Sequence, residues 1–117
     1  MQLAEEGYDV WLMNHRGTWY SQEHEKYNAK DDMEYWLYNM GHIGRYDIPA
    51  NIDIIKGETG VERVFYIGYS MGTTQMFHGF AHHSEYYRQN LLKVIQFGPC
   101  FVPTNPYPDF IMDDIYE

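Results

Sequence analysis

Cationic residues are scarce in this chain of 117 residues. Eight Lys and Arg stand against 17 Asp and Glu, which gives a formal net charge of −9. Nucleic-acid binding needs clustered cations that neutralise phosphates, and electrostatic docking on an anionic membrane surface needs them too. The composition therefore argues against nucleic acid as a partner. The acidic balance favours a simpler role in keeping the protein soluble.

Cysteine is almost absent, since Cys100 is the one thiol in the sequence. A single thiol permits no intrachain disulfide and no cysteine-based zinc site. Its place after an apolar run favours a buried packing role. No His, Asp and Glu spacing fits a zinc site, so we expect no metal. Long apolar runs are also missing, so we expect no integral membrane segment. The first residues lack a basic start and an apolar stretch, so we do not expect a signal peptide there.

What the sequence does contain is alternation between two kinds of short segment. Apolar or aromatic runs predict strands over 8–13, 63–67 and 92–97, and helical spacing predicts helices over 46–56, 73–82 and 84–90. A shorter helix is predicted from Asp31 or Asp32 to Met40, with Gly41 and Gly44 interrupting it. Strands separated by helices indicate an α/β fold with a mostly parallel sheet and flanking helices. The length suits one small domain.

Local signals refine the helices. Residues 3–6 are predicted to form a last helical turn that Gly7 caps. Asp47 is expected to cap the helix over 46–56, and Gly57 or Gly60 to end it. Ile48, Ile52 and Ile55 fall on one face of that helix, as core residues do. Trp11 and Trp36 are expected to pack in the core.

The most informative stretch runs from Val64 to Thr74. An apolar strand leads into Gly68-x-Ser70-x-Gly72, and a predicted helix follows. A nucleophile elbow needs this order of strand, sharp turn and helix. Ser70 is then the candidate nucleophile, and the backbone N–H of Met71 a candidate oxyanion-hole donor. Gly68 and Gly72 would let strand and helix approach closely. The alternative is an ordinary glycine-rich turn in which Ser70 caps the helix.

Four blocks of the sequence, in order, resemble the acid lipases of the gastric and lysosomal type. They are Leu3-Ala4-x-x-Gly7-Tyr8-Asp9-Val10-Trp11-Leu12-x-Asn14-x-Arg16-Gly17, Tyr46-Asp47-Ile48-Pro49-Ala50-x-Ile52-Asp53-x-Ile55, Tyr66-Ile67-Gly68-Tyr69-Ser70-Met71-Gly72-Thr73-Thr74 and Phe97-Gly98-Pro99. The resemblance covers about residues 3–102. It implies a partial α/β-hydrolase fold and a serine hydrolase of neutral-lipid esters, either triacylglycerols or cholesteryl esters. It also implies no cofactor, and a lysosomal or secreted setting.

The resemblance further implies that part of the catalytic apparatus lies elsewhere. Residues 1–117 are expected to form one partial domain, with 103–117 beginning a cap or lid region. The triad acid and histidine would follow that region, in the order Ser, Asp, His. Family members usually carry His at the position of Tyr69 and Gln at that of Met71, which affects the shape of the acyl pocket. Trp19 is the candidate for contact with a lipid interface.

Two alternatives to the lipase remain open. The chain could be a catalytically inactive fragment or pseudo-hydrolase. It could also keep the fold and perform another reaction, as a thioesterase or peptidase does, because all of these enzymes use the same elbow.

Overall fold

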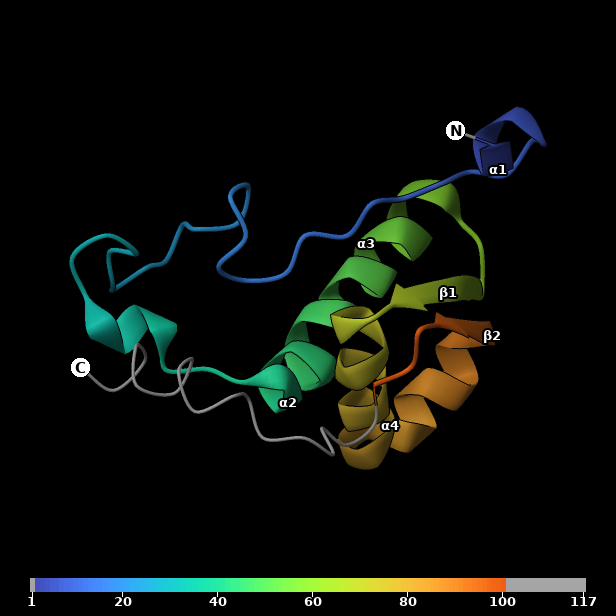
Figure 1. Ribbon diagram of the computed structural model, residues 1–117. Coiled ribbons are helices and arrows are strands. Elements are labelled where there is room, and N and C mark those ends of the chain that lie inside the picture. Colours follow the sequence, from blue (N-terminus) through green and yellow to red (C-terminus); the bar gives the residue numbers. More distant parts are fainter. Residues whose placement is uncertain (1, 101–117) are drawn as a thin grey trace.

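Two parallel strands joined by one long helix form the centre of the structure (Figure 1). The computed structural model describes residues 2–100, so the predicted lid segment 103–117 lies outside the described residues. β1 (Val64–Tyr69) pairs with β2 (Leu91–Phe97), and α4 (Met71–Asn90) connects them. Tyr69, at the end of β1, lies opposite Phe97. The predicted strands over 63–67 and 92–97 are confirmed, as is the α/β class.

The remaining elements precede β1 in the chain. They are α1 (Gln2–Glu5), the 3₁₀ turn η1 (Met33–Trp36), α2 (Met40–His42), the π-helical turn η2 (Ile43–Asp47) and α3 (Ile48–Thr59). Figure 1 shows a long segment without helix or strand between α1 and η1. The cap at Gly7 is confirmed, since this residue follows α1 with a φ of +90°.

The strand predicted over 8–13 is wrong. Within the described residues this segment pairs with no other strand, and Tyr8 and Leu12 are exposed. Aromatic and β-branched side chains favour strands because they pack well on a half-buried pleated sheet. Where no neighbouring strand forms a sheet, this preference does not produce a strand. The core roles predicted for two tryptophans are also wrong. Trp11 and Trp36 are both exposed, and their indole N–H groups donate to Asp9 and to the Ala29 carbonyl.

The helix predicted over 46–56 is confirmed and runs further, to Thr59. Gly60 ends it in the left-handed conformation, with a φ of +73°. The expected interruption at Gly41 and Gly44 is wrong, because α2, η2 and α3 follow one another without a break. The shorter helix predicted before Met40 is a single 3₁₀ turn. The side chain of Asp32 accepts from the Asn28 N–H instead of capping that turn.

The core lies where α4 crosses η2 and the start of α3. Its buried members are Ile43, Ile48, Ile52, Met76, Tyr87 and Leu91. α4 bends at His83, whose φ of −136° and ψ of 43° are not helical. The bend separates the two helices predicted over 73–82 and 84–90. It lets Tyr87 return to the core, where its ring lies against Gly79 and its hydroxyl donates to the Gly44 carbonyl.

Gly44 allows the close approach of η2 to α4. A Cβ there would lie 2.6 Å from the Gly79 nitrogen and within contact of the Gln75 carbonyl, both on the backbone of α4. Backbone atoms cannot move aside as a flexible side chain can. The glycine that the sequence marked as a helix breaker is therefore a packing residue.

We expect Gly44→Ala to lower the free energy of unfolding by about 2–3 kcal/mol, because the two helices must separate to admit the methyl group. Gly57→Ala is the matched control. Its Cβ would meet nothing within 4 Å, and alanine in a helix interior should add about 0.5–1 kcal/mol. Urea unfolding followed by circular dichroism measures both. Equal effects of the two substitutions would contradict the packing role.

Candidate active site

Ser70 connects the end of β1 to the first residue of α4. Its φ is +47° and its ψ −112°, and it is the one non-glycine residue with positive φ in residues 2–100. These angles suit the first central position of a type II′ turn, which glycine usually occupies. A side chain in such a region costs on the order of 1–3 kcal/mol and persists where surrounding contacts enforce it.

Hydrogen bonds hold the strained residue from both sides. The Ser70 N–H donates to the Phe97 carbonyl at 3.0 Å, which extends the parallel ladder by one residue beyond β1. The Ser70 carbonyl accepts from the Thr73 N–H at 2.9 Å and from the Thr73 hydroxyl at 2.6 Å. The sheet therefore fixes one peptide of Ser70, and the first turn of α4 fixes the other.

The Ser70 side chain is exposed and does not cap α4. Ser70 occupies the N-cap position, but within the described chain no helix N–H donates to its hydroxyl. This arrangement contradicts the alternative in which Ser70 is a simple helix cap. The Met71 N–H belongs to the first residue of α4, where helix geometry provides no acceptor within the helix.

The two glycines of the motif differ in role. A Cβ on Gly68 would lie 3.1 Å from the Gly72 carbonyl carbon and oxygen, so β1 and α4 do approach closely at Gly68. A Cβ on Gly72 would lie 3.6 Å from the Tyr66 hydroxyl oxygen, an ordinary contact. The steric need predicted for both glycines therefore holds for Gly68 and not for Gly72 among the described residues.

Tyr66 supports the turn from inside. Its hydroxyl donates to the Gly72 carbonyl at 2.9 Å. Burial raises the pKa of Tyr66 to about 12, so the phenol stays protonated and remains a donor at neutral pH.

Two threonines tie the first turn of α4 to the segment after β2. The Thr73 hydroxyl accepts from the Cys100 N–H at 3.0 Å, and the Thr74 hydroxyl donates to the Cys100 carbonyl at 2.6 Å. Cys100 itself is exposed, so the buried packing role predicted for its thiol is wrong. The backbone of this residue, rather than its side chain, makes the structural contacts.

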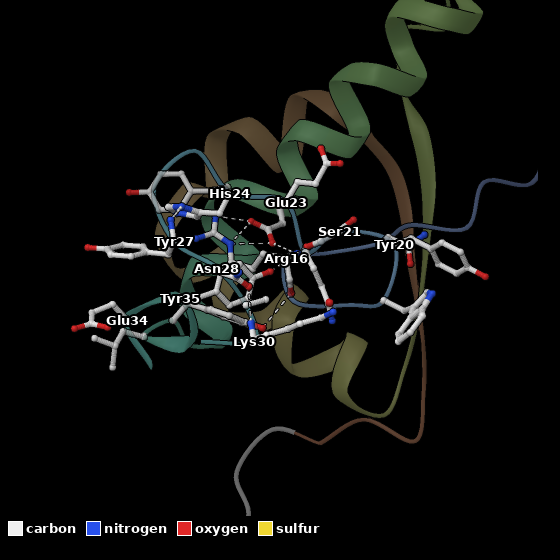
Figure 2. A pocket seen from close by; sticks show the side chains of 18 of the residues that line it. Arg16, Tyr20, Ser21, Glu23, His24, Tyr27, Asn28, Lys30, Glu34 and Tyr35 are labelled. Atoms are coloured by element: carbon white, nitrogen blue, oxygen red, sulfur yellow. Dashed lines mark hydrogen bonds and ion pairs between the residues drawn. The ribbon is translucent and has the colours of Figure 1, made fainter. Parts of the chain in front are cut away.

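A separate open hollow of about 1420 Å³ lies between the loop that precedes η1 and the start of α3. Figure 2 shows Arg16 in its middle, with Tyr20 and Glu34 on opposite sides. Trp19, the candidate for lipid contact, lies on its rim and is 83% exposed. The residues predicted for the elbow do not line this hollow; they are Gly68, Ser70, Met71 and Gly72.

An ion pair organises the inner wall of the hollow. The Arg16 Nε donates to both carboxylate oxygens of Asp47, at 2.8 and 3.1 Å, and the Arg16 backbone N–H donates to Asp47 Oδ2 at 2.8 Å. Asp47 is buried and Arg16 is 38% exposed. Asp47 was expected to cap α3, but its side chain instead ties the Arg16 turn to the helix start.

Sequence reasoning missed this pair, although a signal was present. Arg16 and Asp47 are opposite charges that lie in two of the four family blocks. A short-range sequence pattern cannot predict that they contact each other, because they are 31 positions apart.

In the described residues, no cluster of three or more His, Cys, Asp or Glu could hold a metal ion. No helix there is long and apolar enough to span a bilayer.

Comparison with known proteins assigns the class. A model of the alpha/beta hydrolase fold matches residues 1–112, nearly the whole chain. The chain therefore belongs to the α/β-hydrolase fold family.

The nearer relatives are lipases. Human lipase member K is 43% identical over 83 residues, which cover 71% of this chain and 21% of that protein. The lysosomal acid lipase/cholesteryl ester hydrolase of Macaca fascicularis is 33% identical over 122 residues, or 97% of this chain and 30% of that protein. Mouse gastric triacylglycerol lipase is 43% identical over 79 residues, which cover 68% of this chain and 20% of that protein. The resemblance to acid lipases is confirmed, and the chain spans less than a third of the length of these relatives.

We expect Asp47→Ala to lower the free energy of unfolding by about 2–3 kcal/mol, because it leaves the partly buried Arg16 without its carboxylate. Arg16→Lys keeps the charge but loses the forked donor, and should cost about 1–2 kcal/mol. Asp31→Ala, at an exposed position, should change stability by less than about 0.5 kcal/mol. Thermal and urea unfolding measure all three. A cost for Asp31→Ala as large as that for Asp47→Ala would contradict the role of the ion pair.

Proposed function

We propose that Ser70 is the nucleophile of a serine ester hydrolase that acts on neutral-lipid esters, triacylglycerols or cholesteryl esters. One observation carries the proposal: Ser70 is held at positive φ between a strand and a helix, with its side chain exposed. The sequence of the turn supports it, since Gly68 and Gly72 flank the serine at the elbow spacing.

The reaction proposed is acyl transfer in two stages. The Ser70 Oγ attacks the ester carbonyl carbon, and a histidine accepts the hydroxyl proton. The tetrahedral intermediate carries its negative charge on the former carbonyl oxygen, to which the Met71 N–H donates. As the intermediate collapses, the alcohol leaves with the proton and an acyl-serine forms. Water then attacks the acyl-serine by the same route and releases the fatty acid.

The histidine and its carboxylate partner are proposed to come from parts of the protein outside this chain. Within residues 2–100, no histidine forms a hydrogen bond with Ser70. His78 and His82 are exposed on α4, where their rings stack on each other. A second oxyanion donor is likewise proposed to come from another segment.

The substrate class rests on the names of the relatives, a lysosomal acid lipase/cholesteryl ester hydrolase and a gastric triacylglycerol lipase. Those names include gastric and lysosomal lipases, so we propose a lysosomal or secreted setting and contact with a lipid interface in the intact protein. The alternatives keep the same turn. A pseudo-hydrolase would lack an activated serine, and a thioesterase or peptidase would prefer another acyl donor.

Covalent labelling with a fluorophosphonate tests the nucleophile. We expect the intact protein to be labelled on Ser70, and Ser70→Ala to reduce labelling by a factor of about 10³ or more, because the attacking oxygen is gone. Ser84→Ala, at an exposed serine of α4, should label like the unmodified protein. Peptide mapping by mass spectrometry locates the label. A folded protein that is not labelled would leave the pseudo-hydrolase as the better description, and a label on another residue would contradict Ser70 as the nucleophile.

A further inference from the structure

The Ser70 carbonyl and the Met71 N–H belong to one peptide group. A trans peptide is planar, so the carbonyl and the amide point in opposite directions and turn together. Whatever fixes the direction of the Ser70 carbonyl therefore also fixes the direction of the Met71 N–H. Thr73 provides both donors that hold this carbonyl, its backbone N–H at 2.9 Å and its hydroxyl at 2.6 Å.

The hydroxyl bond closes a ring that contains Ser70. The Ser70 N–H donates to the Phe97 carbonyl, and three residues later the Cys100 N–H donates to the Thr73 hydroxyl. That hydroxyl donates in turn to the Ser70 carbonyl. The ring spans the strained residue from its N–H to its carbonyl and anchors it to the exit of β2.

The Thr73 side chain is suited to this role. It is completely buried, so water does not compete for its hydrogen bonds. A hydroxyl has one donor, and here the donor is directed to Ser70 while a lone pair accepts from Cys100. Threonine hydroxyls often bond back to a carbonyl three or four residues earlier, but this one also joins the start of α4 to Cys100, 27 positions away.

We propose that the Thr73 hydroxyl is a positioning group for catalysis. It keeps Ser70 at positive φ and orients the Met71 N–H toward the developing oxyanion, without touching the substrate. The proposal rests on the function proposed for Ser70. It adds a residue that the elbow motif does not include, and it predicts an effect on the chemical step rather than on binding.

The test uses the intact protein and a fluorophosphonate, with the rate at saturation and the half-saturating concentration measured separately. Thr73→Val keeps the shape and removes the hydroxyl. We expect the saturating rate to fall about tenfold to a hundredfold. This decrease does not exceed the decrease that follows removal of one oxyanion donor, about 10²–10³. The half-saturating concentration should change little. Thr73→Ser restores the hydroxyl and should restore the rate. Thr59→Val is the matched control, because that hydroxyl also donates to a carbonyl at 2.6 Å, at the distant end of α3.

Hydrogen exchange at the Ser70 amide gives a readout that needs no activity. We expect faster exchange in Thr73→Val and restored protection in Thr73→Ser. If the unmodified protein is not labelled, the proposed function of Ser70 is wrong. If the Ser70 amide exchanges equally fast in Thr73→Val and in the unmodified protein, the Thr73 hydroxyl does not hold Ser70 in place.

Three outcomes would overturn the positioning role. The first is that Thr73→Val reacts as fast as the unmodified protein. The second is that Thr73→Ser reacts slowly, since the methyl group rather than the hydroxyl would then be the group that the reaction needs. The third is Thr73→Val that does not fold by circular dichroism, since the hydroxyl would then serve the whole domain rather than the serine.

Discussion

The backbone of Ser70 is the constraint on which the site depends. A residue with a side chain resists positive φ, and a strained conformation survives only where other contacts outweigh its cost. Here those contacts come from a parallel ladder on one side and from a helix start on the other. The bonds from Thr73 are local to the first turn of α4, but the bond to Phe97 is not. β2 has to lie beside β1 before the Phe97 carbonyl can accept from the Ser70 N–H.

The packing of α4 links this turn to the rest of the chain. Gly79 and Tyr87 bring the helix against η2, and Met76 fills the core between them. The bend at His83 lets one helix both leave Ser70 and return the chain to β2. On the opposite face of the sheet, Phe65, Ile67 and Tyr69 are exposed. The described residues thus cover the sheet on the face that supports the elbow.

Local pattern was sufficient for the elements that carry the motif. The run Val64–Tyr69 and the glycines around Ser70 define a strand and a turn without reference to distant residues. The isoleucine spacing likewise predicted the buried face of α3, where Ile48 and Ile52 lie in the core. The strand predicted at Tyr8–Met13 failed because a strand exists only with a partner, which short-range pattern does not supply.

The missed features all join residues that are far apart in the sequence. Gly44 was interpreted as a helix breaker, because its partner Gly79 lies on another helix. Asp47 was interpreted as a cap, because Arg16 lies 31 positions away. The bond from Cys100 to Thr73 spans 27 positions. In each case the residue type was visible in the sequence, and the fold decided which partner it received.

The structure of the intact protein after reaction with a phosphonate ester tests the central claim most directly. We expect a bond from the Ser70 Oγ to phosphorus, positive φ at Ser70, and a phosphoryl oxygen within hydrogen-bonding distance of the Met71 nitrogen. Phosphorus on another residue, or a phosphoryl oxygen turned away from Met71, would contradict the assignment of the nucleophile or of the oxyanion donor.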